Sequence, residues 1–265
     1  MKKITGLFVA MLLLLSSCGS VPLTGRKQVL LVSDQEVLSS SLTQYSDYMK
    51  SAKKSSSKDG AAMVTRVGKR IAAATEQYLK NNGLEREVKN FSWEFNLVKD
   101  PQVNAFCMPG GKIVVYEGLM QLVSSDDELA VVIGHEVAHA VAKHSNERMS
   151  QQLMAQYGAQ ILEQALSNKS AAVQQIGTSV YGLGAQYGVM LPFSRKHESE
   201  ADYMGLVFMA MAGYNPEVAV NFWQKMSAGK SGSTPEFMST HPSDATRINE
   251  IKQHLPEIEK YRVKK

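Results

Sequence analysis

The segment from residue 131 to 144, VVIGHEVAHAVAKH, constrains the fold more than any other stretch of the chain. Its apolar residues would surround a helix on nearly all sides, which is typical of a helix in a protein interior. The same stretch carries His135, Glu136 and His139. Buried imidazoles and carboxylates need partners that replace their lost hydration. We therefore expect a buried helix whose three polar groups share a common partner.

The spacing of these residues predicts that the partner is a metal ion. His135 and His139 are four residues apart, so on a helix their rings lie on one face and can reach one ion. Glu136 can reach a water near that ion without binding it. This HExxH pattern is typical of zinc peptidases in which the glutamate is the general base. The alternative is a pair of core histidines, which we disfavour because a third ligand is available downstream.

Two nearby candidates for that third ligand fail. His144 lies nine residues after His135, which places it about 180° around the helix. The extended HExxHxxGxxH pattern needs glycine and histidine at positions where this chain has Ala142 and Ser145.

The segment from residue 194 to 205, SRKHESEADYMG, offers a carboxylate instead. Glu198 and Asp202 are one turn apart on one helix face, so we expect Glu198 to bind zinc and Asp202 to hold a ligand histidine. Glu200 points about 200° away from Glu198 and is not expected to share that role. The alternative is that these acidic residues and Lys196 form a solvated charged face. We favour the ligand interpretation because an HExxH motif lies upstream.

The rest of the chain predicts a helix-rich α+β fold with a small sheet. Alternating apolar residues predict strands at 91–98 and 112–116. Ser125 and Glu128 form a capping-box pattern where the HExxH helix begins. Further helices are expected over residues 34–50, 61–79, 145–190 with a break near 167–170, 194–212, from 215 onward, and 244–255.

Two segments have alternative interpretations. The strand at 112–116, preceded by 104–106, is a candidate edge for an extended peptide substrate, and the alternative is an internal strand. Residues 145–190 could form a lid over a cleft, although packing helices are favoured. Three methionines of this region are then expected to fill the core: Met149, Met154 and Met190.

His241 is a further candidate catalytic residue. It could donate to the oxyanion, or occupy the open zinc position until substrate arrives. The alternative is a histidine that caps a helix beginning near Ser243. Arg247 is a weaker candidate for the same neighbourhood, whereas His197 and His254 are expected at the surface.

The first residues have the pattern of a secretory signal. Residues 1–17 contain Lys2 and Lys3 followed by an apolar stretch, and the ending Leu-Ser-Ser-Cys resembles a bacterial lipobox. We expect cleavage to leave Cys18 lipidated, with residues 18–33 as a tether. The alternative is an ordinary secretory signal with a chance cysteine. Each buried methylene contributes about 0.8 kcal/mol, so several acyl chains would hold the protein at a membrane.

Charge and cysteine content narrow the remaining possibilities. Removing residues 1–17 takes away two lysines and no acid, so the formal charge falls from +4 to +2. Basic blocks with interleaved aromatic residues are absent from the sequence, and we expect no nucleic acid partner. With Cys18 lipidated, Cys107 is the remaining thiol and is expected to pack rather than react. Gly19 follows Cys18 at the position where an aspartate would indicate retention at the inner membrane in some bacteria, so we favour the outer membrane.

HEVAH followed by HESEAD resembles peptidase family M48, the gluzincin metallopeptidases that include Ste24-like and HtpX-like proteases. Three other stretches are similar to this family, and the resemblance covers nearly all of residues 20–255: VPLTGRKQVLLVSDQE, NAFCMPGGKIVVYEGLM and STHPSDATRINEI. It implies a zincin-like domain over 34–265. Because the sequence contains no candidate spanning helix, it resembles the lipid-anchored bacterial branch of the family.

The resemblance also implies a site and an activity. One zinc ion per chain would be held by His135, His139 and Glu198, with Glu136 as catalytic base and Asp202 beside the ligands. The expected activity is endopeptidase cleavage of unfolded or misassembled envelope proteins, facing the periplasm. The alternative is an envelope chaperone or assembly factor whose zinc is structural or gated.

Overall fold

The computed structural model describes residues 18–228, 235–242 and 245–263 of the 265-residue chain. The predicted signal segment, residues 1–17, lies outside the described residues, as does Ser243, the predicted start of a helix.

The described chain is rich in helices and contains two small sheets, which confirms the predicted α+β class. The helices are α2 (Asp34–Ser51), α3 (Lys58–Asn81), α4 (Glu85–Val88), α5 (Glu117–Met120), α6 (Asp126–Val141), α7 (His144–Leu166), α8 (Ala171–Ala185), α9 (Leu191–Met211), α10 (Val218–Ala228), α11 (Glu236–Thr240) and α12 (Ala245–Ile258). A π-helical turn, η1 (Gln186–Met190), joins α8 to α9, and a 3-10 turn, η2 (Glu259–Tyr261), follows α12.

The main sheet has three strands in the order β3 (Glu94–Val98), β5 (Lys112–Tyr116) and β4 (Ala105–Met108). β5 runs parallel to β3 and antiparallel to β4. The prediction that residues 112–116 form an edge is therefore wrong, because β5 has a neighbour on each side and is buried throughout. Gly110 and Gly111 both have positive φ and form the tight turn that joins β4 to β5, and β4 lies at one edge of the sheet.

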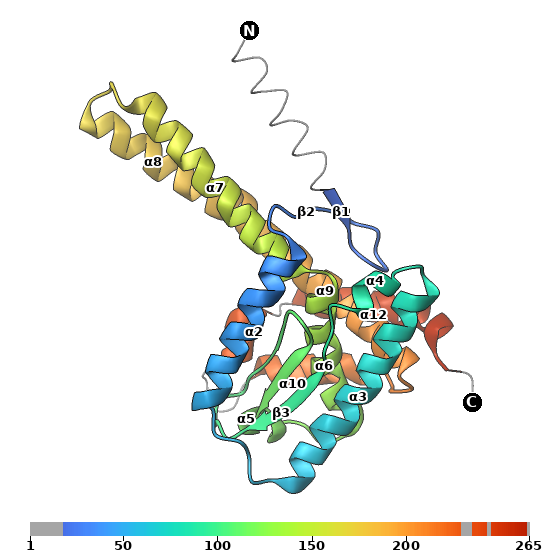
Figure 1. The fold of residues 1–265 in the computed structure, drawn as a ribbon. Helices are drawn as coiled ribbons and strands as arrows, with labels where there is room; N and C mark the ends of the chain where they lie inside the picture. The colour runs from blue at the N-terminus through green and yellow to red at the C-terminus, as the bar shows by residue number, and fades with distance from the viewer. Residues whose placement is uncertain (1–17, 229–234, 243–244, 264–265) are drawn as a thin grey trace.

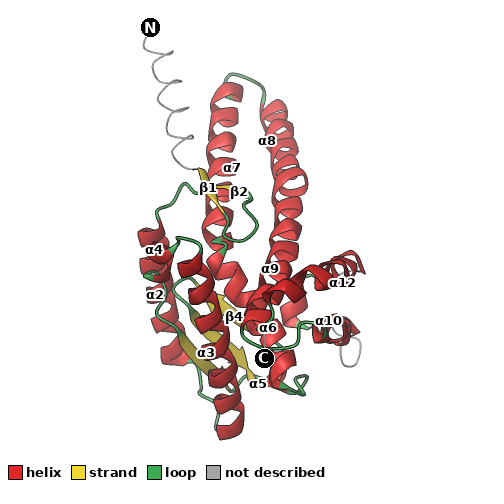
Figure 2. Ribbon diagram, turned by 90° about the vertical axis from the view of Figure 1, so that its right-hand side faces the viewer, coloured by secondary structure: helices red, strands yellow, loops and turns green. Residues whose placement is uncertain are grey.

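Alternation along β5 distributes its side chains between two layers of helices. Ile113 and Val115 pack into the main core with residues of α3 and α6. Val114 and Tyr116 face the opposite side, where they contact Tyr45 of α2. The sheet therefore lies between α2 on one face and the α3–α6 layer on the other (Figures 1 and 2).

α6 is the central helix of the body, and α9 packs along it. The two helices cross at Gly134 and Gly205, where a Cβ on Gly205 would lie 2.9 Å from the His135 backbone nitrogen. Only glycine permits this backbone approach. At the start of α6 the Ser125 hydroxyl accepts from the Glu128 amide, but the Glu128 carboxylate accepts from Ser124, so the predicted capping box is only half formed.

α7 and α8 form a long hairpin that projects from the body (Figures 1 and 2). The predicted break near 167–170 is confirmed, but the prediction of core packing is wrong: Met149 and Met154 are each 39% exposed. Other apolar side chains on the hairpin are also exposed: Tyr157, Ile161, Val173, Ile176, Val180, Leu183 and Tyr187. Over the described residues, none of the helices combines the length and apolarity needed to cross a bilayer.

The N-terminal segment packs onto the body. β1 (Cys18–Ser20) and β2 (Lys27–Val29) form a two-stranded antiparallel sheet. Val21, in the loop between them, is buried in the main core, and Gln28 is also buried. The stretch predicted as a tether therefore makes ordered contacts with the body.

Candidate metal centre

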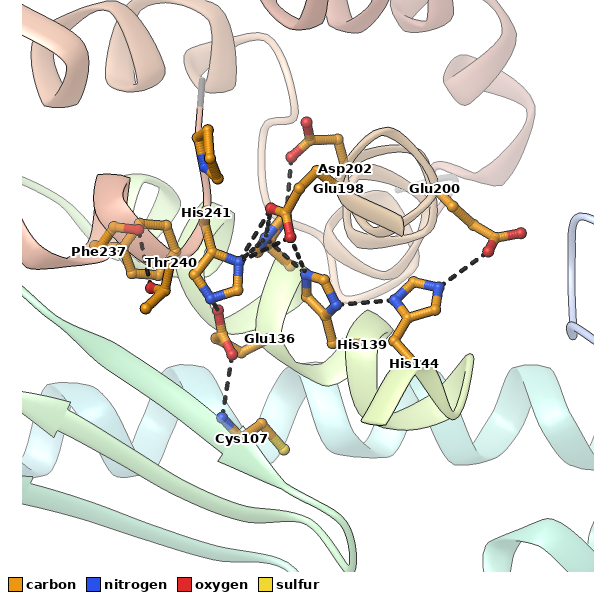
Figure 3. Close-up of polar contacts among 12 residues, drawn as sticks. Cys107, Glu136, His139, His144, Glu198, Glu200, Asp202, Phe237, Thr240 and His241 are labelled. Carbon is orange, nitrogen blue, oxygen red and sulfur yellow. Dashed lines mark hydrogen bonds and ion pairs between the residues drawn. The ribbon is translucent and has the colours of Figure 1, made fainter. Parts of the chain in front are cut away.

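Four donor side chains converge at one point. His135 and His139 come from α6, Glu198 from α9, and His241 from the residue that follows α11. One donor atom of each residue lies within 4.8 Å of the other three, and Figure 3 shows the side chains pointing toward one another. The α6–α9 crossing thus unites two segments about 60 residues apart in sequence, as the helical spacing of both motifs predicted.

The spacing of the donor atoms suits a tetrahedral zinc ion. The Nε2 atoms of His135 and His139 are 3.0 Å apart. The Glu198 carboxylate oxygens lie 3.2 Å from His135 Nε2 and 3.4 Å from His139 Nε2. A tetrahedral zinc ion with ligands at about 2.0–2.1 Å would separate its donor atoms by about 3.3 Å. Two imidazoles and a carboxylate are also a known zinc ligand set.

Burial and neighbouring charges shift the two α6 histidines in opposite directions. Burial lowers the pKa of His135, but its hydrogen bonds to Asp202 and Glu198 outweigh this and raise the pKa to about 9. Burial lowers the pKa of His139 to about 3, so that ring is neutral. The two Nε2 atoms are 3.0 Å apart, a separation that requires a proton or a cation between them. Zinc binding would release the His135 proton.

Asp202 lies beside the candidate ligand His135, as its position one turn after Glu198 predicted. Its Oδ1 atom is 2.9 Å from His135 Nδ1, and its carboxylate accepts hydrogen bonds from Arg247. Burial raises the pKa of Asp202, but the charge of Arg247 outweighs this and holds it below the usual range. Arg247 Nη1 also donates to the carbonyls of His241 and Pro242, at 3.2 and 2.9 Å. Arg247 thus links the carboxylate to the loop that carries the fourth donor.

Glu136 points toward the metal position without joining the donor set. Its Oε2 atom accepts a hydrogen bond of 3.1 Å from the backbone N–H of Cys107 in β4. Its Oε1 atom is buried and makes no hydrogen bond among the described residues, and it lies 3.4 Å from His241 Nε2. A buried carboxylate oxygen without a hydrogen bond is costly unless a water or substrate group completes it. This is the geometry expected of a general base.

His241 occupies the fourth donor position. Its Nδ1 atom lies 3.2 Å from His135 Nε2 and 3.0 Å from Glu198 Oε2, and its ring stacks on Phe237 with 4.5 Å between centroids. The ring points into the site. The alternative, a cap on a helix near Ser243, involves residues outside those described.

The sequence did not predict the polar cluster on the other side of His139. His144 is not a donor to the metal position, as its helical angle implied, but its Nδ1 atom lies 2.8 Å from His139 Nδ1. The prediction that His197 lies at the surface is wrong: it is 2% exposed, stacks on His144 and contacts Glu147. His254 is partly buried against Tyr203.

Cys107 lies beside the site, on the edge strand β4. Burial and the neighbouring Glu136 raise the pKa of its thiol. The side chain is partly buried and packs against the main core. A thiol that holds its proton is a poor nucleophile, so these observations favour packing.

Comparison with known proteins identifies the family. The sequence profile of peptidase family M48 matches residues 64–255, which is more than two thirds of the chain and includes all four donors. The chain belongs to peptidase family M48. This membership agrees with the resemblance of HEVAH and HESEAD to that family.

Several M48 relatives are similar over most of this chain. The mitochondrial metalloendopeptidase OMA1 of Schizosaccharomyces pombe is 35% identical over 205 residues, covering 74% of this chain and 53% of that protein. The beta-barrel assembly-enhancing protease of Yersinia pestis is 31% identical over 178 residues, covering 61% and 36% respectively. Metalloprotease YcaL of Escherichia coli is 25% identical over 193 residues, covering 71% and 74%. The chain thus spans about half the length of the OMA1 relative.

Proposed function

We propose that this chain is a zinc-dependent endopeptidase that cleaves unfolded or misassembled proteins of the bacterial envelope. The observation that carries the proposal is the convergence of His135, His139 and Glu198 beside Glu136, whose buried Oε1 atom makes no hydrogen bond among the described residues. Family membership and the protease names of the relatives support it.

In this proposal the protein holds the metal and moves protons. His135, His139 and Glu198 would hold one zinc ion, which would supply Lewis-acid chemistry by polarising a peptide carbonyl and making water more acidic. Glu136 takes the proton of the attacking water at Oε1, while the Cys107 N–H holds its other oxygen. The same carboxyl group then returns that proton to the leaving amine.

The edge strand β4 is the proposed contact for the substrate backbone. Cys107 in β4 is hydrogen-bonded to Glu136, so a peptide paired along this edge would lie next to the general base. Pairing through backbone hydrogen bonds gives affinity with little dependence on side chains. Such recognition suits substrates that are unfolded, because only an extended segment can add to an edge.

We further propose that His241 gates the site. Structural zinc sites have four protein ligands, whereas catalytic sites keep one position open. With His241 Nδ1 beside Glu198 and His135, the fourth position is closed to water. The His241 side chain is 14% exposed, against 1% for His135, so it is the donor best placed to move aside.

The four-donor arrangement also favours a second candidate function. An envelope chaperone or assembly factor with largely structural zinc would keep His241 as a permanent ligand. One relative's name joins the two candidates, because it is an assembly-enhancing protease. The two candidate functions differ in what they predict for Glu136: an endopeptidase needs this residue for cleavage, whereas an assembly factor with structural zinc does not need it for its function.

The decisive variant is Glu136→Gln, assayed with casein as an unfolded substrate. The amide keeps the size of the side chain and leaves the donors in place, so zinc content should equal that of the parent. Cleavage should fall at least about 100-fold because the general base is lost. Equal cleavage by parent and variant would end the endopeptidase proposal.

His241→Ala separates the gate from its alternatives. Higher basal cleavage supports a gate, because the fourth position is then open. Loss of cleavage with zinc retained supports an oxyanion donor instead. Loss of zinc supports a permanent structural ligand and with it the assembly-factor function.

We also propose that residues 1–17 are a secretory signal, that Cys18 carries lipid, and that residues 18–33 tether a domain spanning 34–265 to the outer membrane, facing the periplasm. The support is the lipobox-like sequence and Gly19 after the cysteine. Cys18→Ala should move the protein from the membrane fraction to the soluble fraction of cells. An unchanged distribution would refute the lipid anchor.

A further inference from the structure

A chain of hydrogen bonds runs from the ligand His139 away from the metal position. His139 Nδ1 lies 2.8 Å from His144 Nδ1, and His144 Nε2 lies 3.0 Å from Glu200 Oε2. Figure 3 shows the three side chains in one line, passing from α6 through the start of α7 to α9. His144 is completely buried and Glu200 is 8% exposed, so water competes little for these contacts.

The far end of this chain is fixed by the N-terminal segment. Glu200 accepts hydrogen bonds from Thr24 Oγ1 at 2.5 Å and from Arg26 Nε at 2.8 Å. The two Nη atoms of Arg26 donate to the two Glu147 carboxylate oxygens, at 2.9 and 2.7 Å. These ion pairs raise the pKa of Arg26, so it is charged at every physiological pH. Thr24 and Arg26 both lie in the stretch between β1 and β2.

Hydrogen bonding fixes a single set of tautomers along this chain. Glu200, held by Arg26, can only accept, so His144 Nε2 carries a proton. A neutral His144 then presents a lone pair at Nδ1, which accepts from His139 Nδ1–H. His139 is left with a lone pair at Nε2, the atom that faces the metal position. The orientation and protonation of His139 thus depend on a carboxylate about 60 residues away in sequence.

We propose that Glu200 and His144 are positioning residues of the zinc site, which act on His139 and are fixed in place by Thr24 and Arg26. The inference rests on the proposed zinc site, but not on peptidase activity. It gives the N-terminal segment a role in the metal centre in addition to that of a tether.

The other ligand histidine provides an internal comparison. His135 Nδ1 contacts the carboxylate of Asp202, which Arg247 holds. Each α6 histidine is thus connected to a carboxylate that an arginine holds. His135 contacts its carboxylate directly, whereas His139 is connected to Glu200 through the imidazole of His144. Partners of this kind typically contribute 10–100-fold to metal affinity.

The test compares two glutamates in the same cluster. Glu200→Gln removes the charge that sets the His144 tautomer, whereas Glu147→Gln makes the same chemical change on the other face of Arg26. Zinc affinity, measured by chelator competition, should fall 10–100-fold for Glu200→Gln and less than about threefold for Glu147→Gln. Equal affinities for both variants would show that the cluster only stabilises the fold, and would overturn the proposal.

A second measurement needs no variant. Nitrogen chemical shifts of the histidine rings in the zinc-loaded parent should show His144 protonated at Nε2 and His139 protonated at Nδ1. A proton on His144 Nδ1 would overturn the proposal, because His144 could not then accept from His139. Neither measurement uses peptide cleavage. The proposed peptidase activity could therefore fail while the tautomers and zinc affinities agree with this proposal, and this proposal could fail while cleavage is observed.

Discussion

The α6–α9 crossing makes a sharp prediction about Gly205. A Cβ at this position would lie 2.9 Å from His135 N and 3.0 Å from the carbonyl carbon of Gly134. Both are backbone atoms of a buried helix, so no side chain can rotate away and the helices must separate. Glu198 lies two turns before Gly205 on α9 and would move with it, away from the two imidazoles.

The expected magnitude follows from two opposing effects. Overpacking costs about 1–3 kcal/mol, whereas alanine is favoured over glycine in a helix by about 1 kcal/mol. Gly205→Ala should therefore lose up to about 2 kcal/mol of unfolding free energy, lowering the melting temperature by up to about 8 °C. Zinc affinity should fall at least about tenfold because the donors no longer converge.

A matched control lies in α8. A Cβ at Gly182 would meet nothing within 4 Å, so Gly182→Ala should not lower the melting temperature and should slow amide exchange in α8. Thermal unfolding of the metal-free proteins and chelator competition for zinc measure both effects. If Gly205→Ala melts and binds zinc like the parent, the crossing does not set the spacing of the donors.

Three further predictions follow from the surroundings of the site. Asp202→Asn should weaken zinc binding by about 10–100-fold in chelator competition, and unchanged affinity would remove its role behind His135. Burial raises the pKa of Glu147, but hydrogen bonds from Arg26 and His197 outweigh this and lower it to about 2. The folded state then binds fewer protons than the unfolded one, so the metal-free parent should be more stable than Glu147→Gln above pH 4.5. This difference should shrink as pH falls toward 2, and a pH-independent difference in melting temperature would contradict the assignment. Cys107→Ala should retain casein cleavage within about twofold, whereas complete loss would indicate a catalytic thiol.

The sequence predicted the parts of the site that depend on one helix at a time. Two histidines four apart on an apolar helix, and two carboxylates four apart on another, fix the faces that must meet. Because the apolar surroundings leave few partners for these groups, the meeting of His135, His139 and Glu198 could be inferred without coordinates. The bounds of one strand, Lys112–Tyr116, were also predicted as they are observed.

Contacts between distant segments were not predictable in the same way. His197 was expected at the surface, yet its ring is buried, stacks on His144 and contacts Glu147, which Arg26 holds. The placement of β5 in the centre of the sheet depends on β3 joining it in parallel, which no local pattern encodes. The methionines of the hairpin looked like core residues because composition cannot tell a packed helix from a projecting one.

The most direct test of the account is the position of the metal itself. Diffraction from zinc-loaded crystals at the zinc absorption edge should place one ion about 2.0–2.2 Å from His135 Nε2, His139 Nε2 and a Glu198 oxygen. An ion bound elsewhere in the chain, or one at the two histidines with Glu198 turned away, would contradict it.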